Sequence, residues 1–301
     1  MWQAVLYNAW HCLFFFLVRP MFKWVVRKVS GRCELLRITY NEPVGASRTH
    51  NIETSLQLSK TPVIRSLAFD ERFNVDEAVE NVQNFKDIKP EVHANFGLFF
   101  KACLLQISGY KQLISDVESM RKMPYSEENE EHEEMLMKLW TGLMPDTQLE
   151  SRISKQWGDI GFQGDDPKTD FRGMGMLGLN NLLYFTTNHN DLARQALSHS
   201  QHPQYGYSFA IVGINLTSVA HILLVANHLK THFYNVVNDR PHLEHFHGVY
   251  SYLFVEFDKY WLEEKPGIME FNTYKDRFMS KMIKQLRNPA TVLQLKSKTR
   301  N

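Results

Sequence analysis

The chain has few cysteines and no excess of charge of either sign, and each shortage excludes a class of protein. The three cysteines, Cys12, Cys33 and Cys103, are odd in number, lie far apart and form no CxxC pair. A disulfide framework and a cysteine-based zinc site are therefore not expected, which suits a reducing compartment such as the cytosol. With 34 basic and 33 acidic residues the net charge is +1, so the chain as a whole does not attract nucleic acid or an anionic membrane.

Signals of β-structure are also missing. No long stretch alternates apolar and polar residues with a period of two, and the hairpin dipeptides Asn-Gly and Asp-Gly do not occur. Apolar residues recur instead at the spacing of one helical turn, in two clear stripes: Leu136, Leu139, Trp140 and Leu143, and then Phe246, Tyr250, Leu253, Phe254, Phe257 and Trp261. These patterns predict an all-α protein, a helical bundle with an N-terminal helical region.

The first 18 residues are almost entirely apolar and are followed by a basic stretch. Six basic residues fall within 19 positions: Arg19, Lys23, Arg27, Lys28, Arg32 and Arg37. A cleaved signal peptide is not expected, because no basic residue precedes the apolar run and no small-x-small cleavage site follows it. The run is close to the minimum of roughly 17 residues for a membrane span, so it could span, re-enter or lie in the interface.

Residues 1–32 are thus predicted to associate with a membrane. The basic flank would keep the rest of the chain cytoplasmic, on the cytosolic face of a membrane such as the endoplasmic reticulum, a lipid droplet or a mitochondrion. The alternative is that the apolar run forms a helix that packs on the core of the domain.

Breaks in the helical pattern divide the chain. Four segments are expected: 1–32, the membrane-associating segment; 33–123, the N-terminal helical region; 124–292, the main helical domain; and 293–301, a basic tail. The acidic run Glu127–Glu134 is interpreted as a solvated linker that leads into a helix at Met135.

A glycine-rich stretch, residues 157–185, is the strongest candidate for a functional site. Its glycines match the G-x-G-x-x-G spacing of a dinucleotide fingerprint, but the residues before them are loop-like, so the strand that this motif requires is missing. We interpret the stretch as a rigid loop that leads into a helix. The helix is predicted to start near Phe171, with Thr169 or Asp170 as its cap.

Arg172 lies in this stretch and could reach into a partner. Gly173 and Gly175 have no side chain, so they would leave a surface that another backbone can approach closely. Asp170 could hydrogen-bond the guanidinium and hold it in place. The alternative is a purely structural arginine, which would brace the loop by pairing with one of its three aspartates: Asp165, Asp166 and Asp170.

The same stretch resembles the signature of the ELMO domain. The resemblance rests on Trp157, Gly161, Phe162, Gln163, Pro167, the TDFRG run at 169–173, Gly175, Leu177, Gly178, Leu179, Leu182 and Phe185. It extends over nearly the whole chain, through residues 202–217, 244–247, 48–53, 103–113 and 138–140. The chain is similar to the short ELMO-domain-containing proteins, and not to the longer ELMO scaffolds that work with Dock exchange factors.

The resemblance implies a GTPase-activating protein for Arf and Arf-like small GTPases in the GTP-bound state. The arginine of the family's TDFRG motif is held to be essential and falls on Arg172. Such an arginine could insert as a finger, worth on the order of 10³–10⁵ in rate, or could order the GTPase's own switch residues. The residues expected to shape or support the docking loop are Gln163, Asp170, Gly173 and Gly175.

Further expectations concern cofactors, intrinsic catalytic activity and an alternative function. No cofactor and no intrinsic catalytic activity are expected, because the arginine would act in the active site of the partner. The alternative function is a scaffold that binds a GTPase or an exchange-factor complex without accelerating hydrolysis.

A second polar group, His242, Glu244, His245 and His247, follows Pro241. A zinc site would need a further firm ligand and a partner to orient each imidazole. The simpler interpretation is the start of a helix, with Glu244 at the positive end of its dipole. We therefore predict no metal site.

Overall fold

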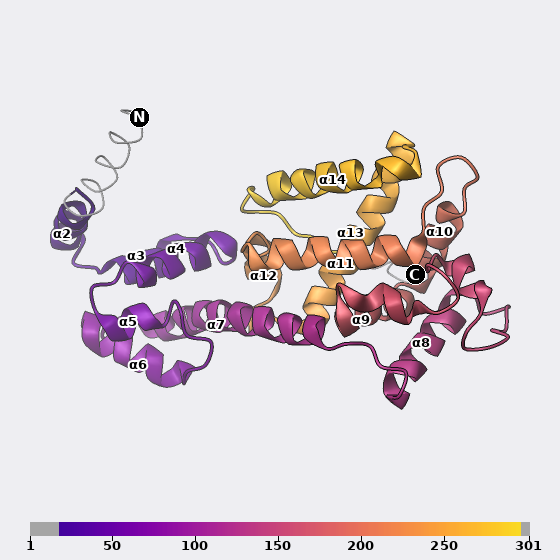
Figure 1. The fold of residues 1–301 in the computed structure, drawn as a ribbon. Helices are drawn as coiled ribbons and strands as arrows, with labels where there is room; N and C mark the ends of the chain where they lie inside the picture. Colours follow the sequence, from indigo (N-terminus) through magenta and orange to yellow (C-terminus); the bar gives the residue numbers. More distant parts are fainter. Residues whose placement is uncertain (1–17, 296–301) are drawn as a thin grey trace, which may run out of the picture. The chain divides into compact units, whose positions relative to one another are not determined.

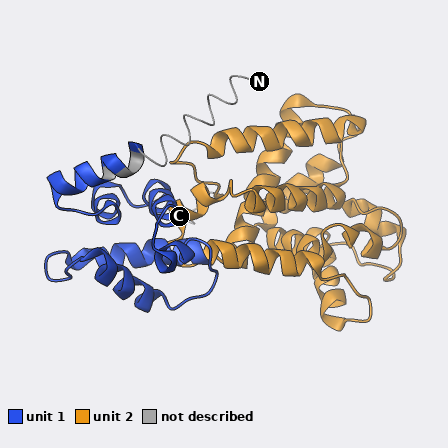
Figure 2. Cartoon of the chain, turned by 60° about the vertical axis from the view of Figure 1, so that its left-hand side comes forward, with its two compact units in different colours: residues 1–108 blue, residues 109–301 orange. Residues whose placement is uncertain are grey.

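The computed structural model describes residues 18–295 of the 301-residue chain, and these residues form helices joined by turns, with no strand among them (Figure 1). The prediction of an all-α fold is confirmed. The chain forms two compact units, residues 1–108 and residues 109–301 (Figure 2). Their boundary lies within helix α7 (Ala94–Lys122), whereas the sequence suggests a boundary at residue 123.

Unit 1 is built from short helices and the first part of α7. These helices are α2 (Arg19–Ser30), α3 (Glu34–Asn41), α4 (Ala46–Gln57), α5 (Pro62–Ser66) and α6 (Val75–Lys86). Asn74 caps α6, since its Oδ1 accepts the N–H groups of Asp76 and Glu77. On α4 the buried hydroxyl of Thr49 donates a hydrogen bond to Oε1 of Gln106 at 2.5 Å, so this polar group is paired inside the core.

Helix α2 presents exposed apolar side chains next to basic ones. Pro20 occupies its first turn, where the missing N–H costs nothing, and Gly31 ends it in the left-handed conformation. Its exposed large apolar side chains are Met21, Phe22, Trp24, Val25 and Val29. The predicted apolar run at residues 1–17 lies outside the described part of the chain.

Unit 2 contains the rest of α7 and the remaining helices. The α-helices are α8 (Glu130–Leu143), α9 (Gly175–Asn188), α10 (Asn190–Ser200), α11 (Phe209–Val225), α12 (Lys230–Val236), α13 (Leu243–Glu264) and α14 (Phe271–Leu286). Three short 3-10 helices lie between them: η2 (Lys155–Ile160), η3 (Pro167–Arg172) and η4 (Ile268–Glu270).

Helix α9 lies at the centre of unit 2 and packs against α8, α10, α11 and α13. The close approach depends on Gly213 in α11, because a Cβ there would lie 2.5 Å from Cδ2 of Leu182 and 2.8 Å from the hydroxyl of Tyr250. Glycine therefore lets α9, α11 and α13 meet at this point. Trp261, the last residue of the predicted aromatic stripe, is fully buried, so the interpretation of that stripe as core is confirmed.

The acidic run does not form a linker, contrary to the interpretation from the sequence. Helix α8 begins at Glu130 and not at Met135, so that three acidic residues of the run, Glu130, Glu131 and Glu133, lie in its first turn. Asn129 caps the helix, with its Oδ1 accepting the N–H groups of Glu131 and His132. Carboxylates are stabilised at the positive end of a helix dipole, and the acidic residues therefore extend the helix.

No single helix among residues 18–295 has both the length and the apolar character needed to cross a membrane. One pair, α11 with α12, passes the same test by length and composition when taken together, and it is bent by 83° at its break. Most side chains of α11 are buried inside unit 2.

Candidate functional site

Arg172 ends a short 3-10 helix at the surface of unit 2. We call residues 161–174 the arginine loop; it connects η2 to α9 and contains η3. The predicted helix start near Phe171 is wrong, because η3 ends at Arg172 and α9 starts at Gly175. Arg172 therefore lies at a joint between two helices and not in the first turn of one.

Asp166 caps η3, in place of the predicted Thr169 or Asp170. Its Oδ1 accepts the N–H of Lys168 at 3.0 Å. Pro167 follows in the first turn, where its fixed φ suits the helix and its missing N–H costs nothing. The start of η3 is thus determined by two adjacent residues.

Asp170 supports the loop without hydrogen-bonding the arginine. Its Oδ2 accepts the backbone N–H of Gln163 at 2.8 Å, which ties the two ends of the loop together. Burial raises the pKa of the Asp170 carboxyl, while the Gln163 N–H and the charge of Arg172 act in the opposite direction. The predicted hydrogen bond from Arg172 to Asp170 is wrong. The charge of Arg172 acts on the Asp170 carboxyl, but the two side chains form no hydrogen bond.

Buried aromatic side chains support the backbone that leads to Arg172. The ring of Phe171 stacks on Tyr125 with centroids 5.4 Å apart and meets the edge of Phe162 at 5.6 Å. Phe162 in turn packs against Trp157, which is fully buried. The buried ring of Phe171 therefore holds the backbone in place next to Arg172, and the side chain of Arg172 extends from there to the surface.

The side chain of Arg172 is exposed and makes no hydrogen bond or ion pair with any residue in the range 18–295. The structural alternative requires it to pair with an aspartate of the loop. Asp166 instead pairs with Arg152 at 3.0 Å, and Asp170 is bonded to the N–H of Gln163. The structure thus contradicts the interpretation of Arg172 as a brace.

The two glycines that follow Arg172 have different surroundings. Gly173 is exposed, and a Cβ added to it would have no atom within 4 Å. Gly175 is buried with φ +52°, and a Cβ there would lie 2.4 Å from the carbonyl oxygens of both Arg121 and Met123. The expectation of an open surface agrees with the geometry at Gly173 and is wrong for Gly175. At Gly175 the missing side chain instead lets the start of α9 pack against the end of α7.

A second arginine, Arg152, lies under the loop, and the sequence analysis did not identify it. Its guanidinium donates to Glu133 at 2.6 Å, to Asp166 at 3.0 Å and to the Tyr125 hydroxyl at 3.3 Å. Partial burial acts to lower the pKa of Arg152, but the bonds to Glu133 and Asp166 outweigh it and raise that pKa. We call these four residues the Arg152 cluster. Its members are 14 to 27 positions from Arg152, so no local motif marks them.

The histidines that follow Pro241 serve the fold. His242 is the residue before α13, and Nδ1 of His245 accepts its backbone N–H at 3.2 Å, as the prediction of a helix start requires. Nδ1 of His247 lies 2.6 Å from Oδ1 of Asn181 in the core, where burial lowers the pKa of His247 to about 4. In the described part of the chain no group of three or more His, Cys, Asp or Glu side chains is arranged to hold a metal ion.

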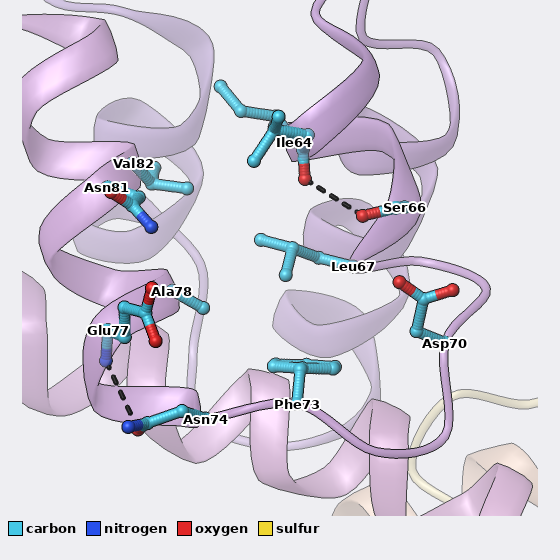
Figure 3. Close-up of a pocket in the computed structure, with 11 residues that line it drawn as sticks. Ile64, Ser66, Leu67, Asp70, Phe73, Asn74, Glu77, Ala78, Asn81 and Val82 are labelled. Atoms are coloured by element: carbon cyan, nitrogen blue, oxygen red, sulfur yellow. Dashed lines mark hydrogen bonds between the residues drawn. The ribbon is translucent and has the colours of Figure 1, made fainter.

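Elsewhere among residues 18–295, each unit has a hollow. That of unit 2, of about 450 Å³, lies beside the histidines at the start of α13. That of unit 1, of about 190 Å³, lies between α5 and α6, with Leu67 and Phe73 between the two helices (Figure 3). Its lining contains no histidine, lysine or arginine, and the Ser66 hydroxyl donates to the carbonyl of Val63 at 3.1 Å. The ionisable side chains of its lining are the carboxyls of Asp70 and Glu77, with no imidazole or cation beside them. The arginine loop remains the candidate site.

The arginine loop lies in a part of the chain that matches a known protein family. The model of the ELMO/CED-12 family matches residues 115–275, which include the arginine loop and the Arg152 cluster. The chain is 54% identical over 274 residues to ELMO domain-containing protein 2 of Bos taurus, covering 91% of this chain and 93% of the relative. No solved structure matches the chain.

Two more distant relatives extend the comparison. ELMO domain-containing protein 1 of Pongo abelii is 50% identical over 303 residues, with 94% of this chain and 93% of the relative covered. ELMO domain-containing protein B of Dictyostelium discoideum is 38% identical over 267 residues, with 87% and 93% covered. The similarity therefore extends over nearly the full length of each relative.

Proposed function

The chain belongs to the ELMO/CED-12 family, and we propose that it is a GTPase-activating protein for Arf and Arf-like small GTPases that supplies Arg172 in trans. The observation that carries the proposal is the contrast between two arginines. Arg152 is held by Glu133 and Asp166, whereas Arg172 is exposed and has no such partner among residues 18–295. A guanidinium that local carboxylates leave unpaired is available to an anion of another molecule.

An exposed arginine of this kind can stabilise the transition state of GTP hydrolysis. Negative charge in the transition state spreads over the γ-phosphoryl oxygens, and a guanidinium from a partner neutralises it with a planar fork of donors. Gly173, which is exposed and has open space around its Cα, leaves room for the GTPase backbone beside Arg172. The proposed function needs no cofactor, because the GTPase itself holds the nucleotide.

The proposal is tested by single-turnover release of γ-phosphate from a panel of Arf and Arf-like GTPases loaded with GTP. Arg172→Ala and Arg172→Lys should both abolish acceleration, since the ammonium of lysine lacks the fork geometry of the guanidinium. Both variants should keep the thermal midpoint of the wild type, because the exposed side chain of Arg172 forms no hydrogen bond or ion pair within residues 18–295. The matched control is Arg194→Ala, which removes an exposed arginine of α10 and should leave the rate unchanged.

Two outcomes would contradict the proposal. If Arg172→Lys kept more than about a tenth of the wild-type rate, the loss would be under one decade where a finger implies several. If the wild type bound a GTP-loaded GTPase without accelerating hydrolysis, the chain would be a scaffold, which is the rival function.

We also propose that residues 1–32 attach the protein to the cytosolic face of a membrane. Helix α2 supports this proposal, because its exposed apolar residues Phe22, Val25 and Val29 recur within one or two turns. Arg27 and Lys28 are exposed in the last turn of the same helix. An apolar surface combined with basic side chains favours the interface of an anionic bilayer.

A further inference from the structure

We infer that Arg152 is a positioning residue for Arg172: the Arg152 cluster clamps the base of the arginine loop and so determines where the guanidinium of Arg172 can reach. This role presupposes the proposed function and extends it to a residue that lies outside the loop. The side chain of Arg152 is only 26% exposed, and that of its partner Glu133 is 23% exposed.

The first link runs from Arg152 to the start of η3. Nη1 of Arg152 donates to Oδ1 of Asp166 at 3.0 Å. The same oxygen accepts the N–H of Lys168 at 3.0 Å and thereby caps η3. Because η3 is a single short helix that ends at Arg172, a shift of its capped end moves the arginine as well.

The second link runs through Tyr125 to the residue before Arg172. The Tyr125 hydroxyl donates to Glu133 and accepts from Nη2 of Arg152 at 3.3 Å. These bonds fix the ring of Tyr125, which stacks on Phe171 with centroids 5.4 Å apart. Arg152 thus holds the arginine loop at both ends of η3.

The main chain of Arg152 is fixed too. Its carbonyl oxygen accepts the indole N–H of Trp157 at 2.9 Å, and Trp157 is fully buried. Glu133, the partner of Nε, projects from α8. The guanidinium therefore bridges a helix, a turn and the arginine loop at once, which the single ammonium of a lysine cannot do.

The consequence concerns the chemical step more than docking. A catalytic group that is displaced by about 1 Å can cost on the order of 10² in rate. Loss of the clamp should therefore lower kcat for partner GTP hydrolysis by roughly 10- to 100-fold. KM should change little, because the exposed surface around Gly173 remains in place.

The test uses full-length protein and single-turnover hydrolysis by a GTP-loaded GTPase that the wild type activates. Arg152→Lys keeps the charge and removes the bridge. Asp166→Asn keeps the cap of η3, because asparagine caps as well as aspartate, and removes only the ionic partner of Arg152. Lys259→Ala, which breaks the exposed Lys259–Glu256 pair on α13, is the control and should leave kcat unchanged.

Two measurements separate positioning from a structural role. Per folded molecule, Arg152→Lys should lower kcat while KM stays close to the wild-type value, because the docking surface is intact and only the placement of Arg172 has changed. Amide hydrogen exchange should become faster at Phe171 and Gly173 in Arg152→Lys, whether or not a GTPase is present.

Each contrary result has a distinct meaning. A lower thermal midpoint with a normal rate per folded molecule would mean that Arg152 only stabilises the fold, and the inference would be wrong. A raised KM with an unchanged kcat in Arg152→Lys would mean that Arg152 contributes to docking and not to the placement of Arg172, which also overturns it. If the wild type did not accelerate hydrolysis, both the proposed function and the positioning role of Arg152 would be wrong. If the wild type was active and Arg152→Lys had a normal kcat, only the positioning role would be wrong.

Discussion

Gly173 and Gly175 lie two positions apart, yet their substitution should change different properties of the protein. Gly175→Val is expected to destabilise unit 2, because φ is +52° and a Cβ would lie 2.4 Å from the carbonyl oxygens of Arg121 and Met123. Gly173→Val is expected to leave stability nearly unchanged, because its φ is −81° and nothing lies within 4 Å of a Cβ.

The magnitude at Gly175 follows from two costs. A left-handed backbone with a Cβ costs roughly 1–2 kcal/mol, and overpacking against atoms that cannot move costs typically about 1–3 kcal/mol. Their sum, about 2–5 kcal/mol, corresponds to a fall of roughly 5–20 °C in the thermal midpoint of a domain of this size. The carbonyls of Arg121 and Met123 belong to the backbone, so a rotamer change cannot relieve the contact.

The assay measures the thermal midpoint and the rate of partner GTP hydrolysis on one preparation of each variant. Gly175→Val should lose stability while its folded fraction keeps a normal KM. Gly173→Val should keep its midpoint and show a raised KM, because the new side chain obstructs the partner's backbone. A midpoint of Gly175→Val within about 1 °C of wild type, well below the shift expected for a domain of this size, would refute the reasoning from the contact distances.

Two further predictions concern the N-terminal segment and a buried histidine of α12. Deleting residues 1–32 should move the protein from membrane to soluble fractions without reducing the rate per folded molecule; recovery of the intact protein in the soluble fraction under gentle lysis would contradict this. Burial, and secondarily the charge of His245, lowers the pKa of His232 from 6.5 to about 4, so the unfolded chain binds the proton more readily between these values. The free energy of unfolding should therefore fall by up to about 3 kcal/mol as pH drops from 6.5 to 4. His232→Asn, whose amide oxygen can accept the N–H of Leu293 as Nδ1 does, should flatten this slope in urea titrations.

The sequence predicts the fold class and the interior well. Apolar residues at one-turn spacing can face a core only in a helix, and Leu136, Trp140 and Trp261 are all buried, as the spacing requires. The sequence also singles out Arg172, through a run of residues that resembles a known motif. These successes rest on local patterns, which a single sequence carries directly.

The errors arose where distant residues decide the structure. Gly175 looked like an open glycine in sequence, but its surroundings are backbone atoms from residues 121–123, far outside the local window. The Arg152 cluster could not be predicted from the sequence for the same reason, since Glu133 lies 19 positions from Arg152. The start of α8 at Glu130 was predictable from local chemistry, because an asparagine followed by acidic residues is a helix start signal.

The acidic residues of the arginine loop show why Arg172 stays available. A loop with three aspartates would ordinarily capture a neighbouring guanidinium, since a close carboxylate is its preferred acceptor. Asp166 is occupied by Arg152 and by the N–H of Lys168, and Asp170 is turned to the N–H of Gln163. With Asp166 bound to Arg152 and Asp170 bound to the Gln163 N–H, neither carboxylate pairs with Arg172, and the guanidinium of Arg172 stays at the surface.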